Sequence, residues 1–166
     1  MIQPGSYSVR GAIMNEAGLA RLLAKAAKEW GKDMAPVALQ AKPETPFGDV
    51  WRVVESAATN GCPPAFDVRV PEIPWRKSLR FDTTEPVPAP TNTVRIVCRR
   101  EGLRFENRPV TPEELQRVLG HLQSVDRAAY LCITATEDVA YQNVIAVLDE
   151  CEHEGFRERI LRLERK

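Results

Sequence analysis

The chain of 166 residues lacks an excess of charge of either sign and any long hydrophobic run. Its 23 basic and 23 acidic residues give a formal net charge of zero, so it has no electrostatic footprint for nucleic acid or an anionic membrane surface. No stretch approaches the roughly eighteen apolar residues of a membrane-spanning helix, and the start carries no signal-peptide pattern. We therefore expect a folded module that binds no nucleic acid and does not itself enter a bilayer.

The chain also lacks the motifs that mark common catalytic and metal centres. It has no phosphate-binding P-loop and no G-x-G-x-x-G, G-x-S-x-G or H-E-x-x-H sequence. Its cysteines form no C-x-x-C pair and are too few to staple a fold of this length; they are Cys62, Cys98, Cys132 and Cys151. The sequence therefore predicts a protein that is not an enzyme, with no cofactor and no metal.

The histidines and cysteines are the remaining candidates for reactive groups. His153 lies in the sequence CEHE, which resembles a metal-ligand cluster, but neighbouring residues on a helix point in different directions. We therefore expect both histidines to be solvated. Cys98 and Cys151 fall in phase with apolar residues, which predicts buried thiols. Cys132 shares a strand face with Tyr130, opposite the face assigned to helix packing, so we expect it to be exposed or at an interface.

An internal repeat is the clearest feature that the sequence does contain. Residues 44–55 recur as residues 138–149, an offset of 94 (138 − 44), and the frame continues to Gly61 and Gly155. Upstream, residues 14–23 match residues 110–119 at an offset of 96 (110 − 14). The first half therefore carries two extra residues between its helices. A repeat of this period predicts that each half is a structural unit.

The second half shows alternating and helical hydrophobic patterns in a regular order. It predicts a hairpin, a helix, a strand, a second helix and a closing strand, over residues 94–106, 111–124, 129–134, 141–151 and 160–163. Thr111-Pro112-Glu113-Glu114 is a capping box that begins the first helix, and Gly155 is a natural cap after the second. The hairpin strand is expected to close at Asn107-Arg108.

The first half reads in the same order, except at its start. It predicts strands over residues 7–13, 36–41 and 66–70 and helices over residues 15–30 and 46–59. The counterpart of residues 94–98 would lie before Met1, which suggests a native precursor that begins upstream with a membrane anchor. Residues 72–92 hold several prolines and no sustained period, so they predict a stiff linker. The expected fold class is α+β, with two units, residues 1–71 and 93–166, each of two helices on a small mixed sheet.

Residues 94–163 resemble the periplasmic domain of the ExbD/TolR family over nearly its whole pattern. The resemblance is carried by RPVTPEELQRVL, by an apolar strand, and by TEDVAYQNVIAVLDECEHEG before a final strand. Residues 6–70 resemble the same pattern more faintly, through MNEAGLARLL, PVALQAKPETPFGDVWRVVESAATNG and FDVRV. The whole chain is therefore similar to a tandem of two such domains.

The resemblance implies a non-catalytic subunit that transmits proton-motive force from an ExbB/TolQ-type channel partner to transport or envelope processes. Such domains dimerise and bind an envelope protein or peptidoglycan. The implied location is the periplasmic face of the inner membrane, held by a segment absent from this chain. The family's essential aspartate lies in that segment, so no residue here is assigned the proton-carrying role. Two alternatives remain open: a cytoplasmic adaptor that binds a protein or peptide through a sheet edge, and a small-molecule-binding domain with a pocket between the halves.

Five residues are candidates for weak partner binding. Glu137, Asp138 and Tyr141 lie at the turn before the last helix, although the two carboxylates also suit a helix N-terminus. Trp75 lies in the linker, where it either pins the linker onto a domain or forms part of a docking surface. Leu161 lies in the closing strand, whose edge could pair with a second copy or an extended peptide.

Overall fold

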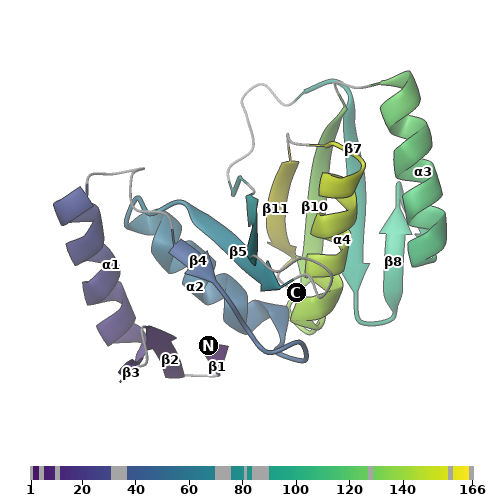
Figure 1. Ribbon diagram of the computed structural model, residues 1–166. Helices are drawn as coiled ribbons and strands as arrows, with labels where there is room; N and C mark the ends of the chain where they lie inside the picture. Colours follow the sequence, from purple (N-terminus) through teal and green to yellow (C-terminus); the bar gives the residue numbers. More distant parts are fainter. Residues whose placement is uncertain are drawn as a thin grey trace.

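The computed structural model describes residues 2–3, 6–9, 12–30, 37–69, 76–80, 82–83, 90–126, 129–156 and 159–164. These residues form four helices and three β-sheets, which confirms the α+β class (Figure 1). The helices are α1 (Glu16–Trp30), α2 (Phe47–Thr59), α3 (Pro112–Val125) and α4 (Tyr141–His153). All four lie within two residues of the predicted bounds.

The second half contains a five-stranded mixed sheet in the order β11-β10-β7-β8-β9. Its strands are β7 (Thr93–Arg99), β8 (Gly102–Phe105), β9 (Arg108–Val110), β10 (Tyr130–Thr136) and β11 (Arg159–Glu164). Strand β10 runs parallel to β7 and β11, whereas β7, β8 and β9 are antiparallel. The expected hairpin is β7-β8.

Strand β9 was not predicted, because residues 107–108 were expected to close the preceding strand. Glu106 and Asn107 both adopt positive φ, at 46° and 70°. Two successive residues of this kind make the tight turn whose twist suits antiparallel strands. The chain therefore reverses once more, and β9 pairs with β8 before α3 begins.

The first half contains two three-stranded sheets, in the orders β1-β2-β3 and β4-β5-β6. Their strands are β1 (Ile2–Gln3), β2 (Ser6–Val9), β3 (Ala12–Met14), β4 (Val37–Leu39), β5 (Pro64–Arg69) and β6 (Arg76–Arg80). The single strand expected over residues 7–13 is a hairpin, β2-β3. Strand β6 falls in the expected linker, where it pairs antiparallel with the otherwise open edge of β5. Its sequence, RKSLR, has too few apolar residues to signal a strand.

The linker also reaches the second sheet. The Asp82 N–H donates to the Arg159 carbonyl at 3.1 Å, and the Leu161 N–H donates to the Asp82 carbonyl at 2.9 Å. Strand β11 is the terminal strand of its sheet, as the sequence indicated, but the chain itself covers part of that edge.

The capping signals act as predicted. The Thr111 hydroxyl accepts the Glu114 N–H at 3.2 Å, and the Glu114 carboxylate accepts the Thr111 N–H at 2.8 Å, which completes the capping box of α3. Gly61 and Gly155 follow α2 and α4 with φ of 71° and 85°, a conformation that favours glycine. Both helices therefore end where a glycine stands in the sequence.

Pairing registers recur along the chain. Tyr7 pairs with Ile2 and Met14, and 96 residues later Leu103 pairs with Cys98 and Val110 (103 − 7). Ile2 of β1 therefore corresponds to Cys98 of β7 (98 − 96), so the expectation that the whole counterpart of residues 94–98 lies before Met1 is wrong at this residue. Helices α2 and α4 begin 94 residues apart (141 − 47) and end 94 residues apart (153 − 59).

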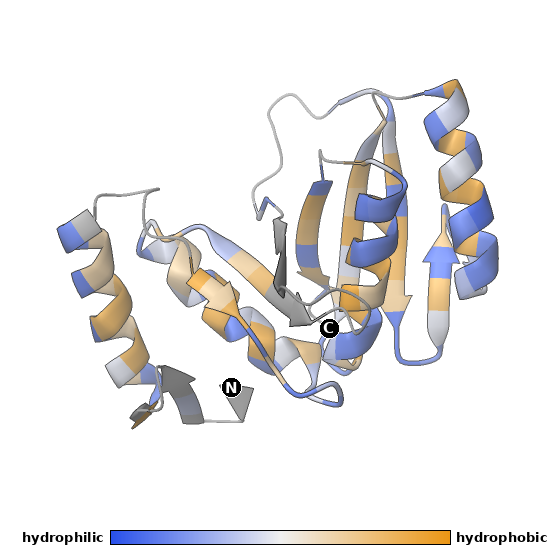
Figure 2. Ribbon diagram, viewed as in Figure 1, coloured by the Kyte–Doolittle hydropathy of each residue, from blue (hydrophilic) through white to orange (hydrophobic). Residues whose placement is uncertain are grey.

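One continuous apolar cluster crosses both halves. Its fully buried members include Phe47, Phe66, Leu115, Leu119, Ile133 and Leu148. Orange and blue residues alternate along α3, so one helical face is apolar and the other polar (Figure 2). A second cluster on the other face of β10 and β11 contains Tyr130, Cys132 and Ile160. The expectation that Cys132 is exposed or at an interface is therefore wrong, because that face is covered as well.

Candidate partner-binding site

Two turns, one from each half, meet at the junction between α2 and α4. Four backbone hydrogen bonds join them. Two bonds are donated by the start of α2: Phe47 N–H donates to Val139 O at 2.8 Å, and Gly48 N–H donates to Glu137 O at 2.9 Å. The other two are donated by the start of α4: Tyr141 N–H donates to Thr45 O at 2.8 Å, and Gln142 N–H donates to Pro43 O at 3.0 Å. The start of each helix is thus bonded to the turn that precedes the other helix.

These bonds form reciprocal pairs. The donors of two of these bonds, Phe47 and Tyr141, are 94 residues apart (141 − 47). Their acceptors, Val139 and Thr45, are also 94 residues apart (139 − 45), so each half donates to the other at the equivalent position. At the centre Pro46 pairs antiparallel with Ala140, also 94 residues away (140 − 46). Reciprocity of this kind is the signature of a two-fold contact. A local two-fold axis therefore passes between Pro46 and Ala140.

Gly48 permits the close approach of the two turns. A Cβ atom at this position would lie 3.1 Å from the Glu137 Cβ and 3.3 Å from the Glu137 carbonyl oxygen. Ordinary van der Waals contacts begin at about 3.4 Å, so a side chain here would push the Glu137 backbone away.

Aromatic rings fill the junction beneath these bonds. The Phe66 ring stands edge-on to Tyr141, with ring centres 5.4 Å apart and an interplanar angle of 84°, and edge-on to Phe47 at 6.2 Å. The Trp51 ring lies 5.8 Å from that of Phe47. Tyr141 is 5% exposed. Its side chain, which the sequence assigned to an external partner, packs instead on the other half of the chain.

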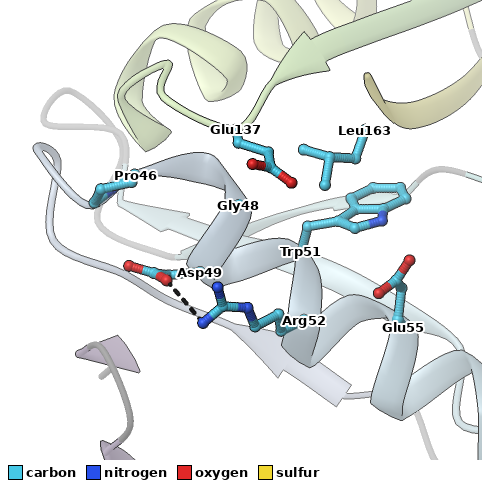
Figure 3. A pocket seen from close by; sticks show the side chains of 8 residues that line it. All are labelled: Pro46, Gly48, Asp49, Trp51, Arg52, Glu55, Glu137 and Leu163. Atoms are coloured by element: carbon cyan, nitrogen blue, oxygen red, sulfur yellow. Dashed lines mark ion pairs between the residues drawn. The ribbon is translucent and has the colours of Figure 1, made fainter. Parts of the chain in front are cut away.

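A pocket of about 290 Å³ opens beside the junction (Figure 3). Its lining comes from the start of α2 and from two residues of the second half. The lining residues are Pro46, Gly48, Asp49, Trp51, Arg52, Glu55, Glu137 and Leu163. This is the position between the halves that the small-molecule-binding alternative was expected to need.

The pocket combines an apolar wall with an excess of negative charge. Trp51 and Leu163 supply apolar surface, while Asp49, Glu55 and Glu137 supply three carboxylates against one guanidinium. That guanidinium, of Arg52, pairs with Asp49 at 3.3 Å. Carboxylates beside an indole ring suit the binding of a cationic or amphipathic group.

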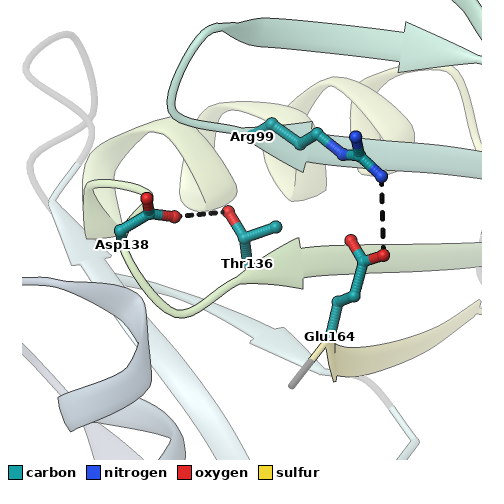
Figure 4. A network of polar contacts seen from close by, with 4 residues as sticks. All are labelled: Arg99, Thr136, Asp138 and Glu164. Carbon is teal, nitrogen blue, oxygen red and sulfur yellow. Dashed lines mark hydrogen bonds and ion pairs between the residues drawn. The ribbon is translucent and has the colours of Figure 1, made fainter. Parts of the chain in front are cut away.

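The predicted site residues fall in different environments. Glu137 is exposed and lines the pocket. Asp138 is exposed, and its carboxylate accepts the Thr136 hydroxyl at 2.8 Å (Figure 4). The N-cap residue of α4 is Ala140, whose side chain makes no capping bond. The Leu161 side chain is fully buried, which leaves only the backbone of β11 for a partner. Trp75 lies outside the described residues.

Sequence reasoning missed the α2 side of the pocket. Trp51 is in phase with the apolar residues of α2 and is 6% exposed, yet it also forms a pocket wall. Asp49, Arg52 and Glu55 gave no sign beyond the polar face of a helix. The available signal was Gly48, because glycine inside a helix often marks a close backbone approach.

The thiols and imidazoles take no part in the site. Burial raises the pKa of Cys98 and of Cys151 to about 12, so both thiols stay protonated at neutral pH. Both are buried, as predicted, and both histidines are exposed, as predicted. Across the described ranges no group of three or more potential metal ligands comes together.

No family model matches the chain, and no curated protein matches it. Among the helices of the described residues, none combines the length and the hydrophobicity of a membrane span.

Proposed function

We propose that this chain is a non-catalytic envelope module, a tandem of two ExbD/TolR-like units formed by residues 1–71 and 93–166. It couples proton-motive force from an ExbB/TolQ-type channel partner to transport or envelope processes by binding a protein or the cell wall. It works at the periplasmic face of the inner membrane, held there by a segment outside this chain. The resemblance of residues 94–163 to that family motivates the proposal.

The recurrence of register is the observation that carries the tandem arrangement. Strand pairing is determined by hydrophobic pattern and turn length, and a slip of one residue moves every side chain to the opposite face. Strands β1–β3 pair residue for residue as β7–β9 do, 96 positions later. Helix starts, helix ends and the glycine after each helix also correspond. A shared order of elements in the two halves would explain these coincidences together, with the strands of the first half in two sheets and those of the second half in one.

The reciprocal junction supports a paired working state. Domains of this family dimerise, and a dimer of identical domains uses one surface twice. Here the turns at residues 43–48 and 137–142 make such a contact within one polypeptide. The two halves are thereby fixed to one another, as force transmission through a small module requires. Further self-association would use another surface, such as the uncovered part of the β11 edge.

The pocket beside the junction is the surface that contacts the partner. Residues of both halves line it, so a ligand bound there contacts both halves beside the junction. Its three carboxylates and one guanidinium favour a partner segment with positive charge and an apolar side chain. Basic segments of an envelope protein and the amino groups of peptidoglycan peptides both offer this chemistry.

Site-specific photo-crosslinking in the native organism tests the proposal. A crosslinking amino acid replaces Glu137 in the pocket, and Ser124, exposed on α3, serves as the control position. We expect the probe at 137 to capture an envelope protein or peptidoglycan, with a yield that changes when an uncoupler collapses the proton-motive force. Two results together would refute the proposed function: the protein is found in the cytosol, and the probe at 137 captures no envelope component with or without uncoupler.

The second candidate is an adaptor that binds an extended peptide along β11. The contact of Asp82 favours it, because this edge already accepts one main-chain hydrogen bond from a non-adjacent segment and donates another to it. Asp82→Pro removes the donor to Arg159 and is expected to free the edge, which would increase capture of extended peptides. Capture that is unchanged in this variant would speak against the adaptor.

A further inference from the structure

The sheet of the second half has two faces of different character. The apolar sides of α3 and α4 share one cluster with Ile96, Ile133 and Ala135, so the helices cover the face on which these side chains lie. Side chains alternate along a strand, so Val97 and Thr134 lie on the opposite face. Strand register gathers basic side chains from several strands on that opposite face.

Four arginines from three strands share this opposite face. Across the sheet, Arg104 of β8 pairs with Val97 of β7, and Val97 pairs with Thr134 of β10. Thr134 pairs in turn with Arg162 of β11, which completes one row across four strands. Two more arginines flank Val97 along β7, two residues before and after it. The row and its two flanking residues form the arginine face, which consists of Arg95, Val97, Arg99, Arg104, Thr134 and Arg162.

Two guanidinium groups of the arginine face have no ionic partner among the described residues. They belong to Arg95 and Arg104, which are both exposed. Arg99 is already engaged, because it pairs with Glu164 at 3.4 Å on the same face (Figure 4). Glu106 borders the face, where its carboxylate accepts the Arg95 backbone N–H at 2.6 Å. The centre of the face therefore presents two guanidinium groups whose donors point to solvent.

The spacing of the arginines matches that of carboxylates on an extended polypeptide. Arg104 is the diagonal cross-strand neighbour of both Arg95 and Arg99, and such neighbours are about 7–8 Å apart. Alternate side chains of an extended polypeptide share one side and are about 7 Å apart. An acidic residue at every second position of such a segment therefore meets successive guanidinium groups.

Nucleic acid fits this face less well than an acidic polypeptide. Proteins that bind single strands without sequence preference add aromatic rings, on which the bases stack. The arginine face has no aromatic member, and Tyr130, on the same side of the sheet, is 5% exposed. Binding to a duplex depends on neutralising many phosphates, whereas this chain has a net charge of zero.

We propose that the arginine face binds an acidic, extended segment of a partner protein. Carboxylates of that segment accept charge-assisted hydrogen bonds from Arg95 and Arg104, and the intervening side chains point away from the sheet. Val97 and Thr134 supply the surface between the guanidinium groups. Different residues line the junction pocket, so this inference does not depend on the proposed envelope function.

Amide chemical shifts of the full-length, ¹⁵N-labelled chain measure the binding. The probes are an N-acetylated peptide of about ten alternating glutamate and threonine residues, the same peptide with glutamine in place of glutamate, and an oligothymidylate of similar length. In about 20 mM salt we expect the glutamate peptide to give saturable shifts at Val97 and Thr134, with a dissociation constant on the order of 1 mM. The other two probes are expected to bind at least about fivefold more weakly. Salt at about 0.5 M is expected to weaken the glutamate peptide several-fold, because it screens exposed charges.

Neutralised arginines supply the variants. Arg95→Gln combined with Arg104→Gln removes two guanidinium groups of the face and is expected to weaken binding about tenfold. Arg21→Gln combined with Arg117→Gln makes the same change at exposed positions of α1 and α3 and is expected to leave binding within about twofold. Both pairs change the net charge equally, so a difference between them reports where the arginines lie. If the face variant does not fold, Arg104→Gln alone carries the test, with Arg117→Gln as its control.

Four results would overturn the proposal. The first is no saturable shift with the glutamate peptide, and the second is equal binding by the face variant and the control variant. The third is binding of the glutamine peptide or the oligothymidylate as tight as that of the glutamate peptide. The fourth is self-association of the parent chain in sedimentation velocity that the face variant abolishes, because a second copy would then occupy the face.

Discussion

Replacing Gly48 with alanine tests whether close contact of the two turns holds the halves together. The added methyl group would lie 3.1 Å from the Glu137 Cβ, about 0.3 Å inside ordinary contact, and it would face the backbone of a turn rather than a flexible side chain. Overpacking of this kind costs about 1–3 kcal/mol. Weakening the 2.9 Å bond from Gly48 N–H to Glu137 O adds up to about 1 kcal/mol. The helical preference of alanine returns up to about 1 kcal/mol. Since the last two terms offset each other, we expect Gly48→Ala to lower the free energy of unfolding by about 1–3 kcal/mol.

Gly120→Ala is the matched control. Gly120 also lies in a helix, but its added methyl group would meet the end of the flexible Glu154 side chain at 3.2 Å, which can rotate away. The control is therefore expected to stabilise the chain by about 0.5–1 kcal/mol. Urea unfolding followed by far-UV circular dichroism gives both values, provided that the m-value is unchanged. If Gly48→Ala proves as stable as the parent or as the control, the turns do not depend on this contact and the reasoning is wrong.

Three further predictions concern the core, a helix cap and the thiols. Phe66→Ala removes a fully buried ring that contacts Tyr141 and is expected to cost about 3–5 kcal/mol in urea unfolding; a loss below about 1 kcal/mol would mean that the halves do not share a core. Thr111→Ala removes the cap of α3 and is expected to cost about 1 kcal/mol, whereas an unchanged midpoint would contradict the capping box. Burial raises the pKa of Cys98 and Cys151 from 9.0 to about 12, so protonated thiols stabilise the folded state fully below pH 9 and progressively less up to pH 12. The urea midpoint should therefore fall across pH 9–12 less steeply in Cys98→Ala than in the parent, and equal slopes would refute this.

Local signals predicted the helices well because caps, terminal glycines and apolar spacing act within a few positions. The capping box at Thr111 satisfies free N–H groups of its own helix, and Gly155 adopts the positive φ that ends the next one. Apolar residues at helical spacing then orient each helix toward the core. None of these effects needs a distant part of the chain.

Pairing between distant segments was harder to predict. Strand β6 has no alternating pattern and forms because β5 offers it an edge. Strand β9 depends on a two-residue turn with positive φ at residues that tolerate it but do not demand it. Cys132 was expected to be exposed or at an interface because its strand pattern does not reveal that the second face of the sheet is covered as well.

The candidate site was likewise predicted only in part from local sequence patterns. Glu137 was singled out from its position in a turn, and it does line the pocket, but Tyr141 from the same turn is buried against Phe66. The difference arises because the turn of the other half approaches at Gly48. A local sequence pattern does not show which two turns will come into contact in the folded chain. Asp49, Arg52 and Glu55 become pocket residues only through that meeting.

By itself the sequence determined the α+β class, the four helices and the 94- and 96-residue offsets, because periodicity, caps and glycines act over short distances along the chain. The tertiary structure alone decided that Pro46 meets Ala140 across a local two-fold axis and that a pocket opens beside this junction. Those contacts join residues 94 positions apart (140 − 46), and they form only when both halves have folded and their apolar surfaces pack into one core.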